Sequence, residues 1–150
     1  MKLMRVGFVG CGAITAQWHL PSIRGTPGVE FTAVSDLDLE HARTMARKFG
    51  VAHAYRDHRD MLGKVDCVVR AAPTATHAGI AGEFLSQGVH VLCEKPVATS
   101  RAELDRMLAS ARSGARLMGA HCMRFMPNMA MLRRVVARGW LGPVPSITGG

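Results

Sequence analysis

The 150-residue sequence has few aromatic residues, few acidic residues and no apolar run of the roughly 18 residues that a membrane span needs. Phe, Trp and Tyr make up 5% of the chain, and 11 Asp and Glu stand against 19 Lys and Arg. The apolar stretch at the N-terminus is too short for a secretory signal and leads into a glycine pair instead of a cleavage site. We therefore expect a cytoplasmic protein that does not associate with membranes and is long enough to bury one domain core.

The four cysteines and seven histidines lack the close spacing of a disulfide framework or a metal site. No CxxC pair occurs, and each cysteine stands in or beside an apolar run: Cys11, Cys67, Cys93 and Cys122. Free cysteines in such positions are usually buried. We therefore expect reduced structural thiols and no bound metal.

The net charge of +8 and the pI near 10.2 are compatible with nucleic-acid binding. The excess arginines are scattered along expected helices, at Arg43, Arg47, Arg101, Arg106, Arg112, Arg133, Arg134 and Arg138. No basic stretch is interleaved with aromatic residues. Net charge bears on association and not on fold. Because the arginines are scattered, we interpret them as the solvated faces of helices and expect no nucleic-acid partner.

Strand-like and helix-like segments alternate along the chain. Strands are expected over 5–9, 29–35, 53–55, 66–72, 89–93, 116–120 and 144–148, and helices over 13–24, 39–49, 59–62, 76–86, 101–112 and 128–138. Gly50 should end its helix, Thr76 should cap the next, and Ser100 with Glu103 should form a capping box. The alternation indicates the α/β class and a doubly wound parallel sheet, which binds ligands beyond the carboxyl ends of its strands.

A glycine pair separates the first expected strand from the first helix. Gly10 permits a sharp turn, and Gly12 lets the backbone approach a pyrophosphate at the helix N-terminus, which begins with Ala13 and Ile14. Thr15 occupies the third position of the GxGxxG fingerprint, so we expect slightly looser packing of helix on strand there. The position between a strand and a helix favours a dinucleotide site.

Asp36 follows the second expected strand, where a carboxylate can accept hydrogen bonds from the adenosine ribose. The same charge repels the 2′-phosphate of NADP. No arginine follows in Leu37-Asp38, so the sequence favours NAD over NADP. The alternative is an acid in an ordinary surface turn.

The strand over 89–93 ends in Glu94-Lys95-Pro96. Pro96 restricts the backbone of Lys95 and holds the lysine at the carboxyl edge of the sheet, beside the expected nicotinamide. A lysine there can bond a substrate hydroxyl or carbonyl and, if partly desolvated, relay a proton during hydride transfer, with Glu94 orienting or tuning it. An ordinary solvent-facing lysine is an equally open reading of the sequence.

Small residues and a proline, Ala72-Pro73-Thr74, leave room for a flat ligand after the strand over 66–72. His77 either contacts the cofactor or lies in the first turn of the helix that follows. We assign His77 no catalytic role.

These segments together resemble the N-terminal domain of the Gfo/Idh/MocA oxidoreductase family. The resemblance covers essentially the whole chain and rests on six motifs in order: GFVGCGAI with His19-Leu20-Pro21, Val34-Ser35-Asp36, Ala72-Pro73-Thr74 with His77, Val91-Leu92-Cys93-Glu94-Lys95-Pro96, His121 with Arg124-Phe125 and Pro127, and Gly139-Trp140-Leu141-Gly142. Two positions depart from the family pattern, Thr15 and Arg70. A buried arginine needs a partner, so we expect Arg70 near a strand end or an exposed face.

The resemblance implies a Rossmann domain over residues 1–142 and the start of a substrate domain over 143–150. It implies hydride transfer between NAD(P) and a sugar, polyol or related alcohol or carbonyl, with Lys95 as catalytic lysine and Asp36 as ribose-binding acid. His121 and Arg124 would lie in a segment that passes the active site. The full-length protein would be a homo-oligomer, and we expect little turnover from residues 1–150 alone.

The expected cofactor-binding residues are Gly10, Gly12, Ala13, Ile14, Asp36, Ala72, Pro73, Thr74, His77, Glu94 and Lys95. An alternative function is a non-catalytic NAD-binding module that senses the cofactor or docks on a partner. The Glu94-Lys95-Pro96 segment favours the oxidoreductase, because a sensor has no need of the lysine.

Overall fold

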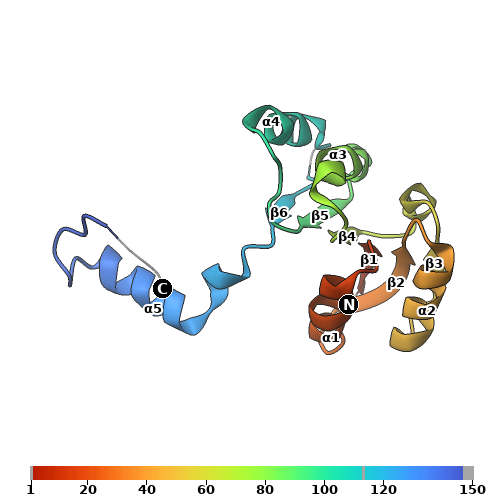
Figure 1. The fold of residues 1–150 in the computed structure, drawn as a ribbon, viewed down its shortest axis with the longest axis horizontal. Coiled ribbons are helices and arrows are strands. Elements are labelled where there is room, and N and C mark those ends of the chain that lie inside the picture. The colour runs from red at the N-terminus through yellow and green to blue at the C-terminus, as the bar shows by residue number, and fades with distance from the viewer. Residues whose placement is uncertain (1, 113, 147–150) are drawn as a thin grey trace. The chain divides into compact units, whose positions relative to one another are not determined.

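The structure, a computed structural model, describes residues 2–112 and 114–146 (Figure 1). The chain divides into two compact units, Met1–Ala120 and His121–Gly150, which are described separately. The domain boundary expected after residue 142 stays a prediction.

The first unit is built on a six-stranded parallel sheet. Its strands are β1 (Met4–Val9), β2 (Val29–Ser35), β3 (His53–Tyr55), β4 (Cys67–Arg70), β5 (His90–Cys93) and β6 (Leu117–Gly119). The spatial order β3-β2-β1-β4-β5-β6 confirms the doubly wound sheet. Because the strand order reverses between β1 and β4, a crevice is expected at the carboxyl ends of these two strands.

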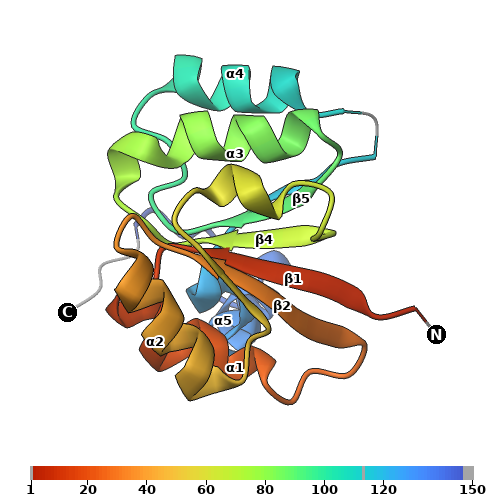
Figure 2. The ribbon, with the colours of Figure 1, turned by 90° about the vertical axis from the view of Figure 1, so that its right-hand side faces the viewer.

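Helices cover both faces of this sheet. They are the π-helical turn η1 (Thr15–His19), α1 (Leu20–Ile23), α2 (Leu39–Phe49), the 3₁₀ turns η2 (His58–Met61) and η3 (Thr74–Thr76), α3 (His77–Ser86) and α4 (Arg101–Ser110). Figure 2 shows α1 and α2 on one face of the sheet, and α3 with α4 on the other. The chain is already helical at residue 13, so the helix expected over 13–24 is present, with a π-helical turn inside it.

Alternation along β1 divides the core in two. Val6 and Phe8 pack with the α1–α2 layer, whereas Val9 packs with the α3–α4 layer. Gly7 also faces the second layer, where a Cβ atom would overlap the side chain of Met61. The glycine therefore lets η2 pack directly against the central strand.

The helix ends largely follow the expected capping. Gly50 ends α2 in the left-handed conformation, and the Ser100 hydroxyl accepts from Glu103 N at the start of α4. Two details were predicted wrongly. The Glu103 carboxylate accepts from Thr99 N and Thr99 Oγ1 instead of Ser100 N, and the hydroxyl of Thr76 donates to Pro73 O instead of capping α3.

The second unit contains η4 (Cys122–Phe125) and α5 (Pro127–Ala137), and neither has a buried residue. Cys122 is exposed, which corrects the expectation of a buried thiol. Residues 144–146 form no regular element, and residues 147 and 148 of the strand expected over 144–148 lie outside the described residues. Across 2–112 and 114–146, no helix is long and apolar enough to span a membrane.

Candidate functional site

The glycine loop turns at the carboxyl end of β1. Gly10 has φ +94°, and a Cβ atom there would lie 2.7 Å from Ala71 O, so this position requires glycine twice over. A Cβ on Gly12 would meet nothing within 4 Å. The space beside Gly12, at the start of the helix, is open to a ligand.

Thr15 fits its place better than the fingerprint predicted. Its side chain is fully buried, and Thr15 Oγ1 donates to Gly10 O at 2.6 Å. The looser packing expected there is therefore wrong, because the hydroxyl ties the helix to the turn. The π-helical turn begins at this residue, and such turns occur frequently at functional sites.

The carboxylate of Asp36, directly after β2, faces the glycine loop. Oδ2 accepts from Cys11 N at 2.8 Å, and Oδ1 accepts from Asp38 N at 3.0 Å. A carboxylate has about four acceptor positions, so each oxygen keeps room for a further donor. Asp36 can therefore hold the loop and accept from ribose hydroxyls at the same time.

A pocket of about 400 Å³ opens where β1, β2 and β4 end. It is lined by Val9, Gly10, Ser35, Asp36, Leu37, Arg56, His58, Ala72, Pro73, Thr76 and Ile80. The lining is mostly apolar with a few polar groups, as is usual for small-molecule sites. The hydroxyl of Ser35 is buried without a hydrogen-bond partner among the described residues.

Arg56 and His58 belong to this pocket, although nothing in their local sequence suggests it. They follow β3, and the in-register pair Ser35–Tyr55 of the parallel strands β2 and β3 places residue 56 beside residue 36. A backbone hydrogen bond of 3.1 Å from Asp36 N to Tyr55 O also holds the ends of these two strands together. Strand register, once β3 is paired with β2, is the signal that could have located them.

Glu94 and Lys95 follow β5, two strands from β1. The carboxylate of Glu94 contacts His19 Nε2 through Oε1 at 2.9 Å and accepts from Lys95 N through Oε2 at 3.0 Å. Glu94 thus orients the backbone of Lys95 and not its amine. The Lys95 side chain is exposed within the described chain, and its peptide bond to Pro96 is cis.

His19 is a third residue that the sequence argument did not single out for the site. It ends the π-helical turn, and its imidazole and the Glu94 carboxylate are both largely shielded from solvent. The contact joins the helix that follows β1 to the segment that follows β5. In the sheet, β4 lies between these two strands.

His77 is the first residue of α3 and is buried. Its Nε2 lies 2.9 Å from Ala72 O and its Nδ1 lies 2.9 Å from Pro96 O. Because both ring nitrogens face backbone carbonyls, His77 joins the loops after β4 and β5. Its predicted contact with the cofactor stays a prediction.

Arg70 is the last residue of β4, which confirms the expected place near a strand end, and it is fully buried. Its guanidinium donates to Ala72 O at 2.8 Å, to Pro73 O at 3.3 Å and to the hydroxyl of Thr76. Burial lowers the pKa of Arg70 to about 10, so the side chain stays cationic at neutral pH. The two terminal nitrogens of the guanidinium are bonded to neutral oxygens and not to a carboxylate. Nε has no partner among the described residues.

Thiols near the site are held protonated. Burial raises the pKa of Cys11 to about 12, with Asp36 adding to the effect, and raises that of Cys93 to about 11. Within residues 2–112 and 114–146, all four cysteines are free, and no group of three or more His, Cys, Asp or Glu could hold a metal ion.

The expected site residues occupy the carboxyl edge of the sheet in different ways. Gly10, Asp36, Ala72 and Pro73 line the pocket. Gly12, Ala13 and Ile14 are exposed at the start of the first helix, and Thr74 is half-buried in η3. His121 and Arg124 are exposed in the second unit, and their predicted roles stay predictions.

A parallel sheet of this order, with a glycine turn at its central strand and an acid after the next, defines a dinucleotide-binding domain. A family model described as "Oxidoreductase family, NAD-binding Rossmann fold" matches residues 4–121. The chain therefore belongs to the Gfo/Idh/MocA oxidoreductase family and contains its NAD(P)-binding domain.

Similar proteins include inositol 2-dehydrogenase 1 of Saccharopolyspora erythraea, 37% identical over 146 residues, which cover 93% of this chain and 43% of that one. The NADP⁺-dependent scyllo-inositol 2-dehydrogenase IolU of Bacillus subtilis is 34% identical, over 88% of this chain and 41% of that one. The chain thus spans less than half the length of these relatives.

Solved structures show the same relation. The WlbA dehydrogenase of Bordetella pertussis, in complex with NADH and UDP-GlcNAcA, superposes with a TM-score of 0.86 at 27% identity, covering 94% of this chain and 44% of that one. A 3-ketoreductase of Actinomadura kijaniata, in complex with NADP and TDP-benzene, gives a TM-score of 0.84 at 28% identity, covering 92% of this chain and 43% of that one.

Proposed function

We propose that this chain is the cofactor-binding part of an oxidoreductase that transfers a hydride between a nicotinamide dinucleotide and a sugar, polyol or related alcohol or carbonyl. The observation that carries the proposal is the placement of the glycine loop, Asp36 and Lys95 after β1, β2 and β5 at one edge of the sheet. Relatives named as inositol dehydrogenases and a ketoreductase support the substrate class.

The residues present fit a dinucleotide. The open space beside Gly12, at a helix N-terminus, suits a pyrophosphate, and the carboxylate of Asp36 has acceptor positions left for ribose hydroxyls. The unpartnered hydroxyl of Ser35 and the apolar lining of the pocket suit the adenosine end. When bound, the nicotinamide supplies or accepts the hydride. The carboxylate at position 36 supports NAD as the preferred cofactor.

Lys95 is the residue we assign to proton transfer. Its ammonium group can donate a hydrogen bond to a substrate carbonyl, and its amine can take the proton of a substrate hydroxyl. Glu94, held by His19 and bonded to Lys95 N, positions the backbone from which that side chain extends. In the described residues the lysine is exposed, so a substrate can reach it.

Calorimetric titration of the 150-residue chain with NADH tests cofactor binding. Saturable binding with a stoichiometry of one is expected, and failure to bind NADH or NADPH would contradict the proposal. For the chemistry, turnover of a polyol and sugar panel is measured on the complete gene product and its Lys95→Met variant. We expect kcat to fall by about two to four orders of magnitude, as for loss of a general acid–base group, while the Kd for NADH is unchanged.

The alternative of a non-catalytic sensor is not favoured, because family membership and the retained Glu94-Lys95 pair both point to redox chemistry. We also propose a cytoplasmic homo-oligomer with a small-molecule substrate and no nucleic-acid partner. The scattered arginines are exposed, either on α2, α4 and α5 or just after the last two of these helices, which supports the absence of a nucleic-acid partner. Light scattering and salt-dependent DNA retention of the complete protein test these two statements.

A further inference from the structure

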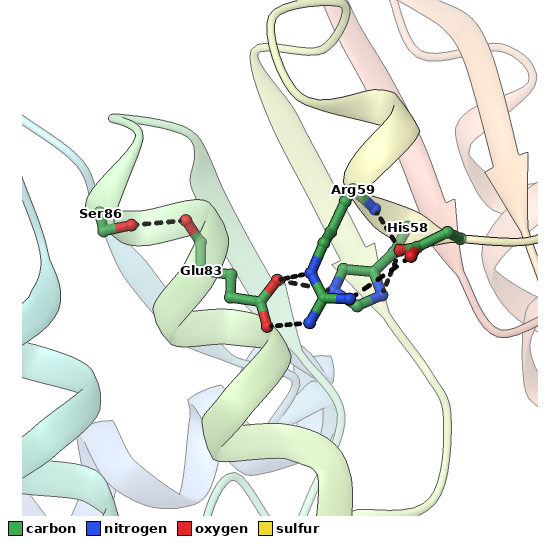
Figure 3. A network of polar contacts seen from close by, with 5 residues as sticks. His58, Arg59, Glu83 and Ser86 are labelled. Atoms are coloured by element: carbon green, nitrogen blue, oxygen red, sulfur yellow. Dashed lines mark hydrogen bonds and ion pairs between the residues drawn. The ribbon is translucent and has the colours of Figure 1, made fainter.

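Three basic side chains stand close together in the segment after β3, and two of them are engaged. Arg59 donates from Nε to Glu83 Oε2 at 2.8 Å and from Nη2 to Glu83 Oε1 at 2.9 Å (Figure 3). The ring of His58 also contacts Glu83 Oε2, at 3.1 Å, and Asp57 Oδ1, at 3.5 Å. Burial raises the pKa of Glu83, but hydrogen bonds from Arg59 and His58 outweigh it and hold the pKa below its ordinary value. This carboxylate therefore compensates the charge of its neighbours.

Arg56 is the exception in this segment. It is exposed, it lines the pocket together with Asp36 and Leu37, and no carboxylate pairs with it in the part of the chain that the structure describes. The Arg59–Glu83 pair holds this segment to α3, and the bond from Asp36 N to Tyr55 O holds it to β2. The backbone is therefore held both before and after Arg56. A cation without a counter-ion thus stands at the rim of the pocket.

The register of the sheet places this cation beside the acid that discriminates cofactors. Ser35 pairs with Tyr55, so Asp36 and Arg56 leave neighbouring parallel strands at the same level. Side chains at the same level on adjacent strands point to the same side of the sheet. Cys11 N holds one oxygen of Asp36 toward the glycine loop, and Asp38 N holds the other within the turn before α2. The guanidinium of Arg56 is therefore left to meet an anion next to the ribose.

Resting on the proposed function, we infer that Arg56 binds the 2′-phosphate of NADP and makes the site accept NADPH as well as NADH. A guanidinium matches phosphate oxygens in bidentate geometry and offsets the repulsion from Asp36. The absence of an arginine next to Asp36 in the sequence, which favoured NAD, is compensated by an arginine twenty positions later that register brings to the same place. Asp36 and Arg56 then act in opposite directions on cofactor preference.

The test is calorimetric titration of the 150-residue chain with NADH and with NADPH, at low and at high salt. The wild-type Kd for NADPH should lie within about tenfold of that for NADH. Arg56→Gln should weaken NADPH about tenfold or more and NADH less than about threefold, and added salt should shrink that difference because it screens an exposed charge pair. Asp36→Asn should shift the preference the other way, toward NADPH.

Arg106→Gln is the matched control, because Arg106 is also exposed but lies on α4, away from the pocket. It should leave both affinities unchanged. Equal losses of NADH and NADPH affinity in Arg56→Gln, or rejection of NADPH by a wild-type chain that binds NADH, would overturn this inference alone. Binding of neither nucleotide by the wild-type chain would overturn the proposed function as well.

Discussion

The amino and carboxyl edges of the parallel sheet treat their polar groups differently. At the amino edge, the Arg5 guanidinium donates to both oxygens of Asp66, at 2.7 and 3.1 Å, and Arg5 N donates to Asp66 Oδ2 at 2.9 Å. At the carboxyl edge, Ser35 Oγ and Arg70 Nε are buried without partners among the described residues. Asp36 there bonds to backbone N–H groups, and in the part of the chain that the structure describes its nearest basic side chain is His41, at 3.9 Å.

This difference between the edges suggests that polar groups at the amino edge stabilise the fold and that those at the carboxyl edge are left for a ligand. A carboxylate that is fully matched by an arginine has little capacity left for a ligand, whereas a carboxylate held by two amides keeps acceptor positions. In open α/β sheets, ligands bind beyond the carboxyl ends of the strands. Substitutions at the two edges should therefore change different measured quantities, and four predictions test that separation.

The largest expected effect is at Gly12, on the carboxyl edge. Gly12→Val fits the protein itself, because nothing lies within 4 Å of its Cβ position, but the side chain would fill the space assigned to the pyrophosphate. We expect NADH affinity to fall at least about a hundredfold, or ~2.7 kcal/mol, with the free energy of unfolding changed by less than about 1 kcal/mol. Calorimetry and urea unfolding measure the two quantities.

Gly25→Val is the matched control for that substitution. Gly25 is equally open and lies in the turn before β2, at the amino edge. Its valine variant should bind NADH normally. If Gly12→Val also binds NADH normally, the pyrophosphate does not approach this loop.

At the amino edge, Asp66→Asn should lower stability and leave NADH affinity unchanged. The hydrogen bond from Arg5 lowers the pKa of Asp66 to about 2 from an ordinary value of 3.8. Because the folded-state pKa is depressed, the stabilisation is fully present above about pH 5 and is lost progressively as the pH falls toward 2. Allowing for partial solvent exposure, we expect a loss of about 1–2 kcal/mol at pH 7.

Urea unfolding of the wild type and Asp66→Asn between pH 7 and pH 2.5 checks this. The two free energies of unfolding should converge as the pH falls. A constant difference over the whole range would show that the substitution acts through packing and not through the ion pair.

Asp38→Ala tests an exception to this difference, because Asp38 lies at the carboxyl edge but stabilises a helix. Asp38 is the N-cap of α2, and its Oδ1 accepts from Glu40 N and His41 N. Loss of such a cap costs about 1 kcal/mol of stability. Thermal unfolding should show that loss, and NADH affinity should change less than twofold. Asp38→Asn keeps the side-chain acceptor and should therefore restore the stability. A large loss of NADH affinity in Asp38→Ala would contradict the proposed difference between the two edges.

The smallest effect should come from thiol modification. At pH 8 an aromatic disulfide reagent should label Cys122 rapidly, because it is exposed. It should label Cys11 and Cys93 slowly, because they are buried and burial raises their pKa values to about 12 and about 11. Labelling of Cys122 should leave NADH affinity unchanged. Mass spectrometry with Cys122→Ser as control identifies the labelled residue, and rapid labelling of Cys11 would mean that the loop opens.

Local patterns located most of the fold. The limits expected for β3 and α2 match the observed elements at both ends, and Gly50 marks the end of α2. The strand at 66–72 was expected too long, because Ala71 and Ala72 look like strand residues but belong to the loop that Arg70 and His77 hold through Ala72 O. The bonding partners of that loop come from distant parts of the chain.

Sequence patterns could locate the candidate residues that follow a single strand, but not those whose position depends on how two strands are aligned. Gly10, Asp36 and Lys95 each follow a recognisable strand. Arg56 enters the pocket because β3 pairs in register with β2, and His19 meets Glu94 across 75 positions of sequence. No spacing rule within a single segment contains either relation.

The π-helical turn Thr15–His19 has a consequence for insertions and deletions in this helix. Such a turn accommodates one residue more than an α-helical turn, and in an α-helix each residue advances the side-chain direction by about 100°. Removing one residue between Thr15 and His19 would therefore leave a regular α-helix whose two flanks keep nearly their present orientation, whereas removing one from Leu20–Ile23 would rotate the residues that follow by about 100°. This turn is therefore the place in the helix that can absorb a change of chain length between the glycine loop and the contact of His19 with Glu94.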